Sequence, residues 1–538
     1  MKKLINLLYS WYKQSNRWYV PLLSGLLFAV SLPPFNHETH WLFAGFPLLS
    51  FILLVPMMIF ALQKPAKRAV LHVYLFGISA SLSQFYWISN VGVEGLKHLI
   101  LLGLAFTTAV VALYYLGIGM LFRLVYKSFP RLYLLLFPSV WILIEYFRTL
   151  GDLAFPWMNL GYVFVPISPL AQLGSVGGVY LLSFLIVLGN ILIFELLRSY
   201  WLSNVIAQKW LHLAVFATFL AGVYFWGMIK IEPMENDRIN VSVLQINLDQ
   251  TNWGNNSLDS SLNVVEKMIV EQRDDSLDLI VLPESAIYCY LLKRPHIRDR
   301  VASWADRVGT PIITGSLHWE YAEDVAKKYD VFNTAYMIAG ATDRFIPYYK
   351  MQLVPGSESI PFKSQFPILS RLNIGSADFS RGTEPVVFNA GKDIMAAPFI
   401  CYEMIFPALV RKRVQEGANL LVNITNDGWF GRSTAPHQHA IMARMRSIEN
   451  GVSLVRSANS GISLAADQFG RELGRTGLFT RDSLVVSVPL SSVKTIYTRY
   501  GDWLVWLSLV FLLLATSIRL FMRFSSNPPV GKAANRKE

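Results

Sequence analysis

Three residues with reactive side chains each lie at the end of an apolar stretch that is typical of a buried strand. Glu284 ends LDLIVLPE, Lys350 ends RFIPYYK, and Cys401 follows APFI and precedes a helical pattern. A thiol must lose its proton before it attacks a carbonyl, so a nearby carboxylate can act as general base. A lysine ammonium can stabilise the resulting oxyanion and also favours the thiolate. The trio predicts acyl chemistry with Glu284 as base, Lys350 as oxyanion partner and Cys401 as nucleophile.

Cysteine usage leaves this thiol free. A lone cysteine after a strand is more often a small core residue, and it is the ordered set of Glu, Lys and Cys that favours catalysis. The chain has two cysteines, and we interpret Cys289 as a packing residue. Two cysteines do not indicate a disulfide framework. No zinc-type Cys/His spacing or phosphate loop stands out, so we expect no metal and no cofactor.

The elements that position the trio alternate between strands and helices over residues 237–493. Strands are expected at 239–247, 277–284, 310–316, 331–340, 344–350, 385–391, 393–400, 419–425, 453–466 and 483–490, and helices at 257–272, 297–309, 405–417 and 437–451. About 250 residues of such alternation suit one domain of stacked sheets covered by helices.

Composition predicts that the rest of the chain crosses a membrane. Hydrophobic residues make up 53% of the 538 residues and charged residues only 16%. Runs long enough to span a bilayer lie at 20–36, 41–62, 70–91, 98–122, 132–147, 170–197, 209–229 and 503–522. We therefore expect a bundle of seven transmembrane helices in 1–229, the α/β domain in 237–493, an eighth transmembrane helix in 503–522 and a basic tail in 523–538. The first run lacks a small-x-small cleavage site near Ser31 to Phe35, which favours a retained anchor over a cleaved signal peptide.

Positive charges in the loops predict the orientation of the bundle. Lysine and arginine concentrate before the first run and after the second, fourth and sixth, at Lys2, Lys3, Lys13, Arg17, Lys64, Lys67, Arg68, Arg123, Lys127, Arg131, Arg198 and Lys209. Such loops stay cytoplasmic, so the N-terminus and the tail are expected inside and the α/β domain outside. The net charge of +12 would also suit nucleic acid. Its confinement to short loops and the tail instead indicates membrane lipids as partners.

Four stretches carry a resemblance to a known family: LPESAIY, YYKMQLVPGSESIPF, ICYEMIFP and ITNDGWFGRSTAPHQHAIMARMRSIENG. They resemble the active-site stretches of the apolipoprotein N-acyltransferases, bacterial membrane enzymes whose CN hydrolase domain belongs to the nitrilase superfamily. The resemblance covers nearly the whole chain. It departs at Pro355–Glu358, where the family usually has Pro-Phe-Gly-Glu, and at His437, which replaces a usual tryptophan. The first departure leaves the shape of the loop that carries Glu358 open.

The resemblance implies a fold, a reaction and a location. The fold is an αββα sandwich beside the transmembrane bundle. The reaction takes an acyl chain from a phospholipid, typically phosphatidylethanolamine, onto Cys401 as a thioester. The chain then passes to the α-amine of a diacylglyceryl-cysteine lipoprotein, the last step of lipoprotein maturation. The enzyme is expected to be a monomer in the bacterial inner membrane, with its catalytic domain in the periplasm.

The resemblance also implies further site residues. Glu358 would orient Lys350, Glu403 would support the site, and the amide of Tyr402 would join Lys350 at the oxyanion. Trp253 and Trp157 match positions linked to substrate binding. A surface location is the alternative for Glu403, and membrane-interface packing is the alternative for Trp157.

Two other functions remain open at this point. A membrane-tethered nitrilase-type amidase acting on a small amide would keep the triad but would need no lipid. A transporter or structural membrane protein would explain the bundle, but it predicts charged or broken helices at the bundle centre and leaves the outer domain without a purpose.

Overall fold

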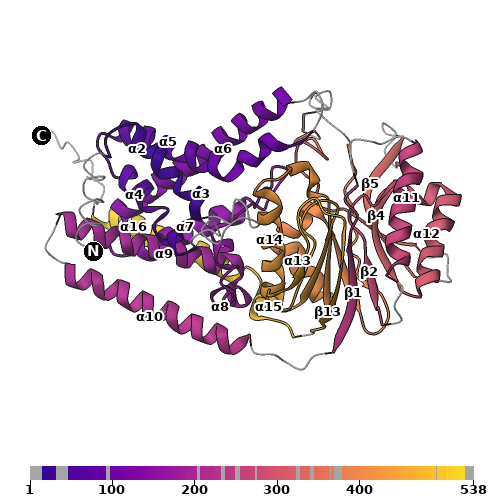
Figure 1. Cartoon of the computed structure of the whole chain (residues 1–538). Coiled ribbons are helices and arrows are strands. Elements are labelled where there is room, and N and C mark those ends of the chain that lie inside the picture. Colours follow the sequence, from indigo (N-terminus) through magenta and orange to yellow (C-terminus); the bar gives the residue numbers. More distant parts are fainter. Residues whose placement is uncertain are drawn as a thin grey trace, which may run out of the picture.

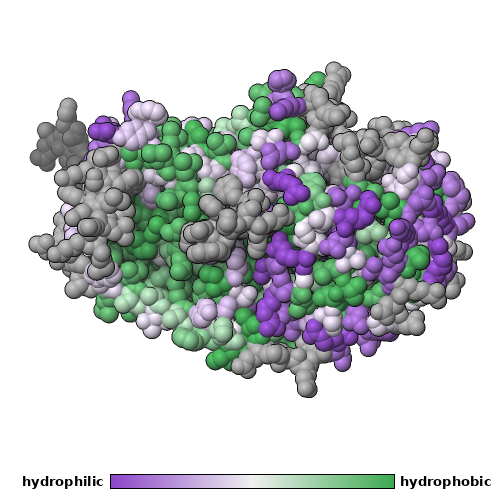
Figure 2. All heavy atoms as spheres, in the orientation of Figure 1, coloured by the Kyte–Doolittle hydropathy of each residue, from purple (hydrophilic) through white to green (hydrophobic). Residues whose placement is uncertain are grey.

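The computed structural model consists of a helical bundle joined along one side to a β-sandwich (Figure 1). It describes residues 15–31, 47–92, 97–202, 206–231, 237–248, 255–272, 276–322, 328–339, 345–363, 365–366, 368, 378–491 and 493–526. The bundle contains the N-terminal half of the chain and the last helix. Figure 2 shows a broad hydrophobic surface over the bundle and a largely hydrophilic surface over the sandwich. This division is expected of a membrane domain carrying a water-exposed domain.

The bundle is built from helices of unequal length. They are α2 (Tyr19–Gly25), α3 (Leu27–Ser31), η2 (Pro47–Ile52), α4 (Val55–Ala61), α5 (Ala66–Phe85), η3 (Tyr86–Asn90), α6 (Lys97–Ser128), α7 (Tyr133–Phe147), η4 (Leu160–Phe164), α8 (Ser168–Ala171), α9 (Gly174–Leu202), α10 (Ile206–Lys230) and α16 (Trp503–Ser526). Among the described residues, four are long and apolar enough to cross a membrane: those over Lys97–Ser128, Gly174–Trp201, Gln208–Lys230 and Trp503–Arg523.

Those four coincide with the runs expected at 98–122, 170–197, 209–229 and 503–522. The runs at 70–91 and 132–147 correspond to α5 and α7, and α7 is only 15 residues long. The two earliest runs, at 20–36 and 41–62, contain several short helices and extend into residues outside the described ranges. A membrane bundle is confirmed, whereas a count of eight spans stays a prediction.

Helix α9 is broken where the sequence predicts a continuous span. Gly177 and Gly178 leave the helical conformation, and Gly178 has φ of +66°. A Cβ at Gly178 would lie 2.6 Å from the Tyr497 ring, so only glycine fits there. Near the break, the Val179 amide donates to Glu449 and the Val176 carbonyl accepts from the Trp503 indole, at 2.8 and 2.9 Å. The partners from outside the helix satisfy backbone groups that the break would otherwise leave unpaired.

The sandwich contains two sheets. Their strands are β1 (Arg238–Gln245), β2 (Leu279–Val281), β3 (Ile287–Tyr290), β4 (Ile312–Tyr321), β5 (Tyr329–Ile338), β6 (Phe345–Tyr349), β7 (Phe388–Asn389), β8 (Met395–Ile400), β9 (Leu420–Thr425), β10 (Ser453–Ala458), β11 (Leu464–Ala466), β12 (Glu472–Arg475) and β13 (Asp482–Pro489). One sheet has the order β13-β1-β2-β4-β5-β6, with β3 beside β4, and the other has the order β12-β11-β10-β9-β8-β7. Both mix parallel central pairs with antiparallel edges.

Helices cover the outer face of each sheet. They are α11 (Asn255–Val270) and α12 (Pro295–Val308) on the first, and α13 (Pro407–Gln415) and α14 (Ala435–Asn450) on the second. Apolar side chains such as Val243, Ile313 and Val422 fill the space between the sheets, and separate cores lie beneath each helix layer. The four layers form an αββα sandwich, which confirms the predicted fold class.

The bundle and the sandwich share one hydrophobic core. Met442, Met445 and Ile448 of α14 pack into the same cluster as the bundle helices. Helix α14 lies between the second sheet and the bundle (Figure 1). Fifteen of its residues are buried, and Arg444 is the one that is not. The short helix α15 (Ile496–Tyr500) then leads into α16.

Candidate active site

Strand ends from both sheets bring the predicted trio together. Glu284 follows β2, Lys350 follows β6 and Cys401 follows β8. Lys350 Nζ lies 3.6 Å from Glu284 Oε1, and the charges of both groups act on the pKa of the Cys401 thiol. Gly315 of β4 permits this arrangement, because a Cβ there would lie 2.7 Å from the Glu284 Cα. An acid, an ammonium and a thiol therefore face one another between the two sheets.

Glu358 and Asn333 complete the surroundings of Lys350. Glu358 Oε1 accepts from Lys350 Nζ at 2.8 Å, and its Oε2 accepts from the Val354 amide at 2.9 Å. Asn333 Nδ2 donates to Glu284 at 2.7 Å and to Glu358 at 3.3 Å. The departure at Pro355–Glu358 thus still places a carboxylate on Lys350. Gly356, with φ of +83°, allows the turn that returns Glu358 to Lys350.

The backbone at Cys401 is held in a conformation that non-glycine residues rarely adopt. Its φ is +50°, which projects the side chain from the sharp turn between β8 and η7 (Cys401–Ile405). Glu403 is fully buried, so the surface alternative for it is wrong. Its Oε2 accepts from the Ile400 amide at 2.7 Å, and its Oε1 accepts from Tyr348 Oη at 2.7 Å and the Met351 amide at 2.6 Å. One carboxylate therefore ties the cysteine turn to the segment after Lys350.

Burial and charge set the protonation of the trio. Burial raises the pKa of Glu284, and Lys350 opposes that shift. Burial would lower the pKa of Lys350, but the carboxylates of Glu358 and Glu284 outweigh it and keep the ammonium charged. Burial, followed by the charge of Glu284, raises the pKa of Cys401, whereas Lys350 lowers it. The resting nucleophile is therefore a thiol beside a ready acceptor for its proton.

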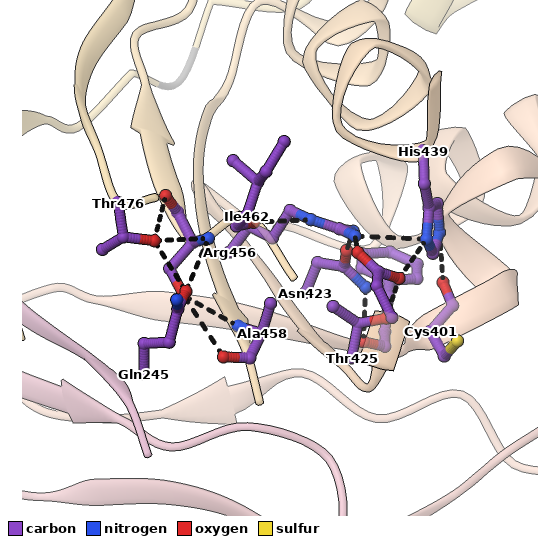
Figure 3. Close-up of polar contacts among 12 residues, drawn as sticks. Gln245, Cys401, Asn423, Thr425, His439, Arg456, Ala458, Ile462 and Thr476 are labelled. Atoms are coloured by element: carbon purple, nitrogen blue, oxygen red, sulfur yellow. Dashed lines mark hydrogen bonds and ion pairs between the residues drawn. The ribbon is translucent and has the colours of Figure 1, made fainter. Parts of the chain in front are cut away.

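A second polar group lies behind the cysteine, and the sequence interpretation missed it. His439 Nε2 lies 3.2 Å from the Cys401 carbonyl oxygen and Nδ1 lies 2.9 Å from Asp427 Oδ1, while Arg456 Nη2 lies 2.6 Å from Asp427 Oδ2. Figure 3 shows this chain of contacts running from Cys401 through His439 to Arg456. Burial and the Arg456 guanidinium lower the pKa of His439, and the Asp427 carboxylate opposes this shift. Because a carbonyl only accepts, Nε2 carries the proton and donates to Cys401.

This cluster does not fit a metal ion. Ligand atoms of Cys401, Asp427 and His439 lie within 4.8 Å of one another. However, Arg456 already donates to Asp427, and its Nη2 lies 3.1 Å from His439 Nδ1. A guanidinium in this position occupies the lone pairs that a cation would need.

Aromatic residues join the site to the bundle. Trp157 is buried, donates to Gln438 at 2.7 Å through Nε1, and lies against the His439 ring at 5.6 Å between centroids. Tyr402 Oη donates to the Ala154 carbonyl at 2.5 Å, and its ring stacks on Phe155. Trp157 thus lies beside the active-site cluster. Trp253 lies outside the described residues.

The pairing state of the cysteines agrees with the sequence interpretation. Both are free, and Cys289 is buried in the core beneath α11 and α12. Burial raises the pKa of Cys289 to about 11. It is a packing residue, as predicted.

Comparison with known proteins assigns the family. Residues 240–498 match the model for carbon-nitrogen hydrolase, and residues 24–192 match the model for the apolipoprotein N-acyltransferase N-terminal domain. The chain is 31% identical over 495 residues to the apolipoprotein N-acyltransferase of Geobacter metallireducens, covering 91% of this chain and 92% of that relative. The chain belongs to the apolipoprotein N-acyltransferase family.

Another member of the apolipoprotein N-acyltransferase family, that of Haemophilus influenzae, is 29% identical over 546 residues, with 98% of this chain and all of that relative covered. Among solved structures, an amidase from Nesterenkonia sp. is 18% identical with a TM-score of 0.35, and the match covers 48% of this chain and 92% of the amidase. Membership of the family favours the acyltransferase interpretation over the amidase and transporter alternatives.

Asn333, Asp427, His439 and Arg456 were the site residues not predicted. One available signal was the stretch from 437 to 451, in which polar residues recur on every side of a helix. Such a helix is either exposed all round or buried with its polar groups paired. The structure shows the second arrangement.

Proposed function

We propose that this chain transfers an acyl chain from a membrane phospholipid to the N-terminal α-amine of a diacylglyceryl-cysteine lipoprotein through a thioester on Cys401. The observation that carries the proposal is the convergence of Glu284, Lys350 and Cys401 between the sheets, in a domain whose core is continuous with the bundle. The names of the relatives support a lipoprotein acceptor and an acyltransferase reaction. Phosphatidylethanolamine is the proposed donor.

In the first step the Cys401 sulfur attacks the ester carbonyl carbon while Glu284 takes the thiol proton. Lys350 and the Tyr402 amide stabilise the oxyanion. Collapse forms the C–S bond and breaks the C–O ester bond, and Glu284 returns the proton to the leaving oxygen. The products are a thioester and a lysophospholipid.

In the second step the α-amine attacks the thioester carbonyl. The C–N bond forms, the C–S bond breaks, and Glu284 passes one amine proton to the departing sulfur. Both substrates use one site in turn, so the kinetics are ping-pong. Glu358 and Glu403 act as positioning residues, and we propose that Trp157 and Trp253 contact substrate.

The location follows from the same proposal. The chain is proposed to be a monomer in the inner membrane of a bacterium, with the sandwich in the periplasm where lipoproteins mature. The loop charges support this orientation. We propose four parts of the chain: a transmembrane bundle in 1–229, the catalytic domain in 237–493, a last transmembrane helix in 503–522 and a cytoplasmic tail in 523–538.

Mass spectrometry of the full chain incubated with phosphatidylethanolamine tests the proposal. We expect one acyl adduct on Cys401, release of lysophospholipid, and loss of the adduct when a diacylglyceryl-cysteine peptide is added. Cys289→Ser should behave like the wild type. An acyl adduct that persists in Cys401→Ala, or hydrolysis of small amides with no lipid adduct, would contradict it.

A further inference from the structure

A cavity of about 550 Å³ lies at the end of the bundle opposite to the sandwich. Its lining includes Arg17, Lys67, Arg68, Trp18, Tyr19 and His72. Helix α5 carries the cavity residues Lys67, Arg68 and His72 in its first two turns. The η3 segment after its last residue leads to Gly92, whose amide donates to the Trp429 carbonyl of the sandwich at 3.2 Å. A helix of 20 residues is about 30 Å long, which is the thickness of a bilayer core. The cavity therefore opens at the opposite membrane surface from the candidate active site.

The charge of this cavity is not neutralised by protein carboxylates in the described part of the chain. Arg17 Nη1 donates to Tyr19 Oη at 3.0 Å and Arg68 Nη1 donates to Asn16 Oδ1 at 3.4 Å, both neutral acceptors. Elsewhere in the bundle, Arg198 and Lys209 each lie within 3.8 Å of a Glu195 oxygen. The three cations of the cavity thus carry a net positive charge that an anion can meet.

A buried histidine supplies a second, independent observation. His72 is 3% exposed, lines the cavity, and has an Nδ1 atom with no hydrogen-bond partner among the described residues. Its ring packs edge-on against Phe60. Buried polar atoms are almost always paired, so this unpaired nitrogen marks the wall of the basic cavity as polar.

We propose that this cavity binds a phosphate-bearing anion at the membrane surface opposite to the sandwich. Guanidinium groups match phosphate oxygens in geometry and charge. Trp18 and Tyr19 are residue types that favour the headgroup level, and basic pockets between transmembrane helices bind anionic headgroups. The site is separate from the proposed acyl transfer and does not depend on it.

Lipid retention by the full chain tests this site. Native mass spectrometry should show phosphatidylglycerol retained in preference to phosphatidylethanolamine. Each cation near a membrane surface contributes about fivefold in affinity, so Arg17→Gln/Arg68→Gln should weaken retention about thirtyfold. The matched control is Lys127→Gln/Arg131→Gln. Arg123 of the same helix donates to the carbonyls of Ala61 and Gln63, so this end of α6 lies near the cavity, but neither control residue lines it.

Three further measurements decide the outcome. His72→Phe keeps the ring volume and all three charges, and it should still reduce retention. Inorganic phosphate, added against chloride at equal ionic strength, should leave lipid retention unchanged if the ligand is a lipid. Displacement of the lipid by inorganic phosphate in the wild type would show that the cavity binds free phosphate rather than a lipid headgroup. Equal retention of both lipids with no effect of phosphate, or equal behaviour of the two double variants, would overturn the proposal.

Discussion

At the scale of single residues, the nucleophile is held by its neighbours rather than activated in advance. A left-handed backbone at a non-glycine residue costs about 1–3 kcal/mol and persists only where surrounding contacts enforce it. Here Glu403 bonds the amide before Cys401, and His439 bonds the Cys401 carbonyl. The thiol stays protonated because burial and Glu284 raise its pKa. Deprotonation therefore belongs to the reaction and not to the resting enzyme.

Glu284 has two effects on the Cys401 thiol: its charge raises the pKa of the thiol, and its carboxylate accepts the thiol proton in the reaction. Removal of Glu284 should separate these effects. Glu284→Gln deletes a negative charge that raises the pKa of Cys401, so alkylation by iodoacetamide at mildly alkaline pH should become faster. Thioester formation should fall by about 10² or more because the base is lost. Rates of alkylation and of acyl-adduct formation, measured on the same preparation, check this. A parallel fall in both rates would mean that Glu284 only maintains the structure.

His439 is expected to act as a positioning residue. His439→Phe keeps the ring beside Trp157 but removes the hydrogen bond to the Cys401 carbonyl. We expect kcat for thioester formation to fall by about tenfold, the net value of one or two hydrogen bonds, with little change in KM. His439→Gln, which can still donate, should recover part of the rate. Failure of Gln to recover more than Phe would remove the hydrogen bond from the explanation.

Sequence patterns predicted the trio because each residue ends an apolar strand, a local signal. The partners of the trio come from distant segments that no periodicity marks. Asn333 lies within β5, between Glu284 and Glu358, and looks like any polar residue of a strand. His439 depends on Asp427, Arg456 and the turn at Cys401 together. Such contacts exist only once both sheets are packed, so the residues had no separate signature.

At the scale of elements, strand packing fixes the distance between base and nucleophile. Gly315 lets β4 approach the chain at Glu284, whose neighbour Ser285 also has a positive φ of 58°. Most elements of the sandwich were predictable from alternation, because buried strands and amphipathic helices have distinct periods. Strands β3 and β12 were not predicted, and the strand expected at 453–466 is divided into β10 and β11. The break in α9 was not predictable from hydropathy, because both halves are apolar. Its cause is the pair Gly177 and Gly178 against Tyr497.

Gly315→Ala should displace Glu284 without removing any catalytic group. The added methyl would lie 2.7 Å from the Glu284 Cα, so the backbone must shift. A displacement of this kind costs about 10² in rate when it misplaces a reacting group. The rate of acyl-adduct formation reports the displacement of Glu284, and the thermal midpoint reports any loss of stability. Thr314→Ser, one residue earlier on β4, is the control and should retain activity. Wild-type rates in Gly315→Ala would show that the site tolerates the shift.

At the scale of the whole molecule, a buried acid joins the sandwich to the bundle. Glu449 of α14 accepts from the Val179 amide and pairs with Arg446 at 3.2 Å. Burial raises the pKa of Glu449 to about 7, and Arg446 opposes the shift. A carboxyl group with a raised pKa stabilises the fold below its unfolded pKa, and that contribution is lost as pH rises to about 7.

The thermal midpoint should therefore decrease between about pH 4.5 and pH 7 more steeply in the wild type than in Glu449→Gln. A shift from 4.5 to about 7 corresponds to on the order of 3 kcal/mol. Differential scanning fluorimetry of the two proteins across this range gives the difference directly. Identical slopes would show that Glu449 does not titrate in the folded protein.

Orientation in the membrane is tested by cysteine labelling in a Cys401→Ala background. A membrane-impermeant thiol reagent should reach Asp299→Cys, on the exposed surface of α12, in intact spheroplasts. Ser525→Cys, at the end of α16, should react only after lysis. The reverse pattern would place the sandwich in the cytoplasm and remove the lipoprotein substrate from reach.

The break at Gly177 and Gly178 also sets an order of events during synthesis. The Val179 amide has its acceptor 270 residues later in the chain, so the ribosome completes α9 long before Glu449 exists. Until then the nascent membrane domain holds an unpaired amide, which is costly in an apolar environment. A fragment of residues 1–231 should consequently be degraded faster in cells than the same fragment co-expressed with residues 232–538. Pulse-chase half-lives of the two samples would measure how strongly the stability of the membrane bundle depends on the enzyme domain.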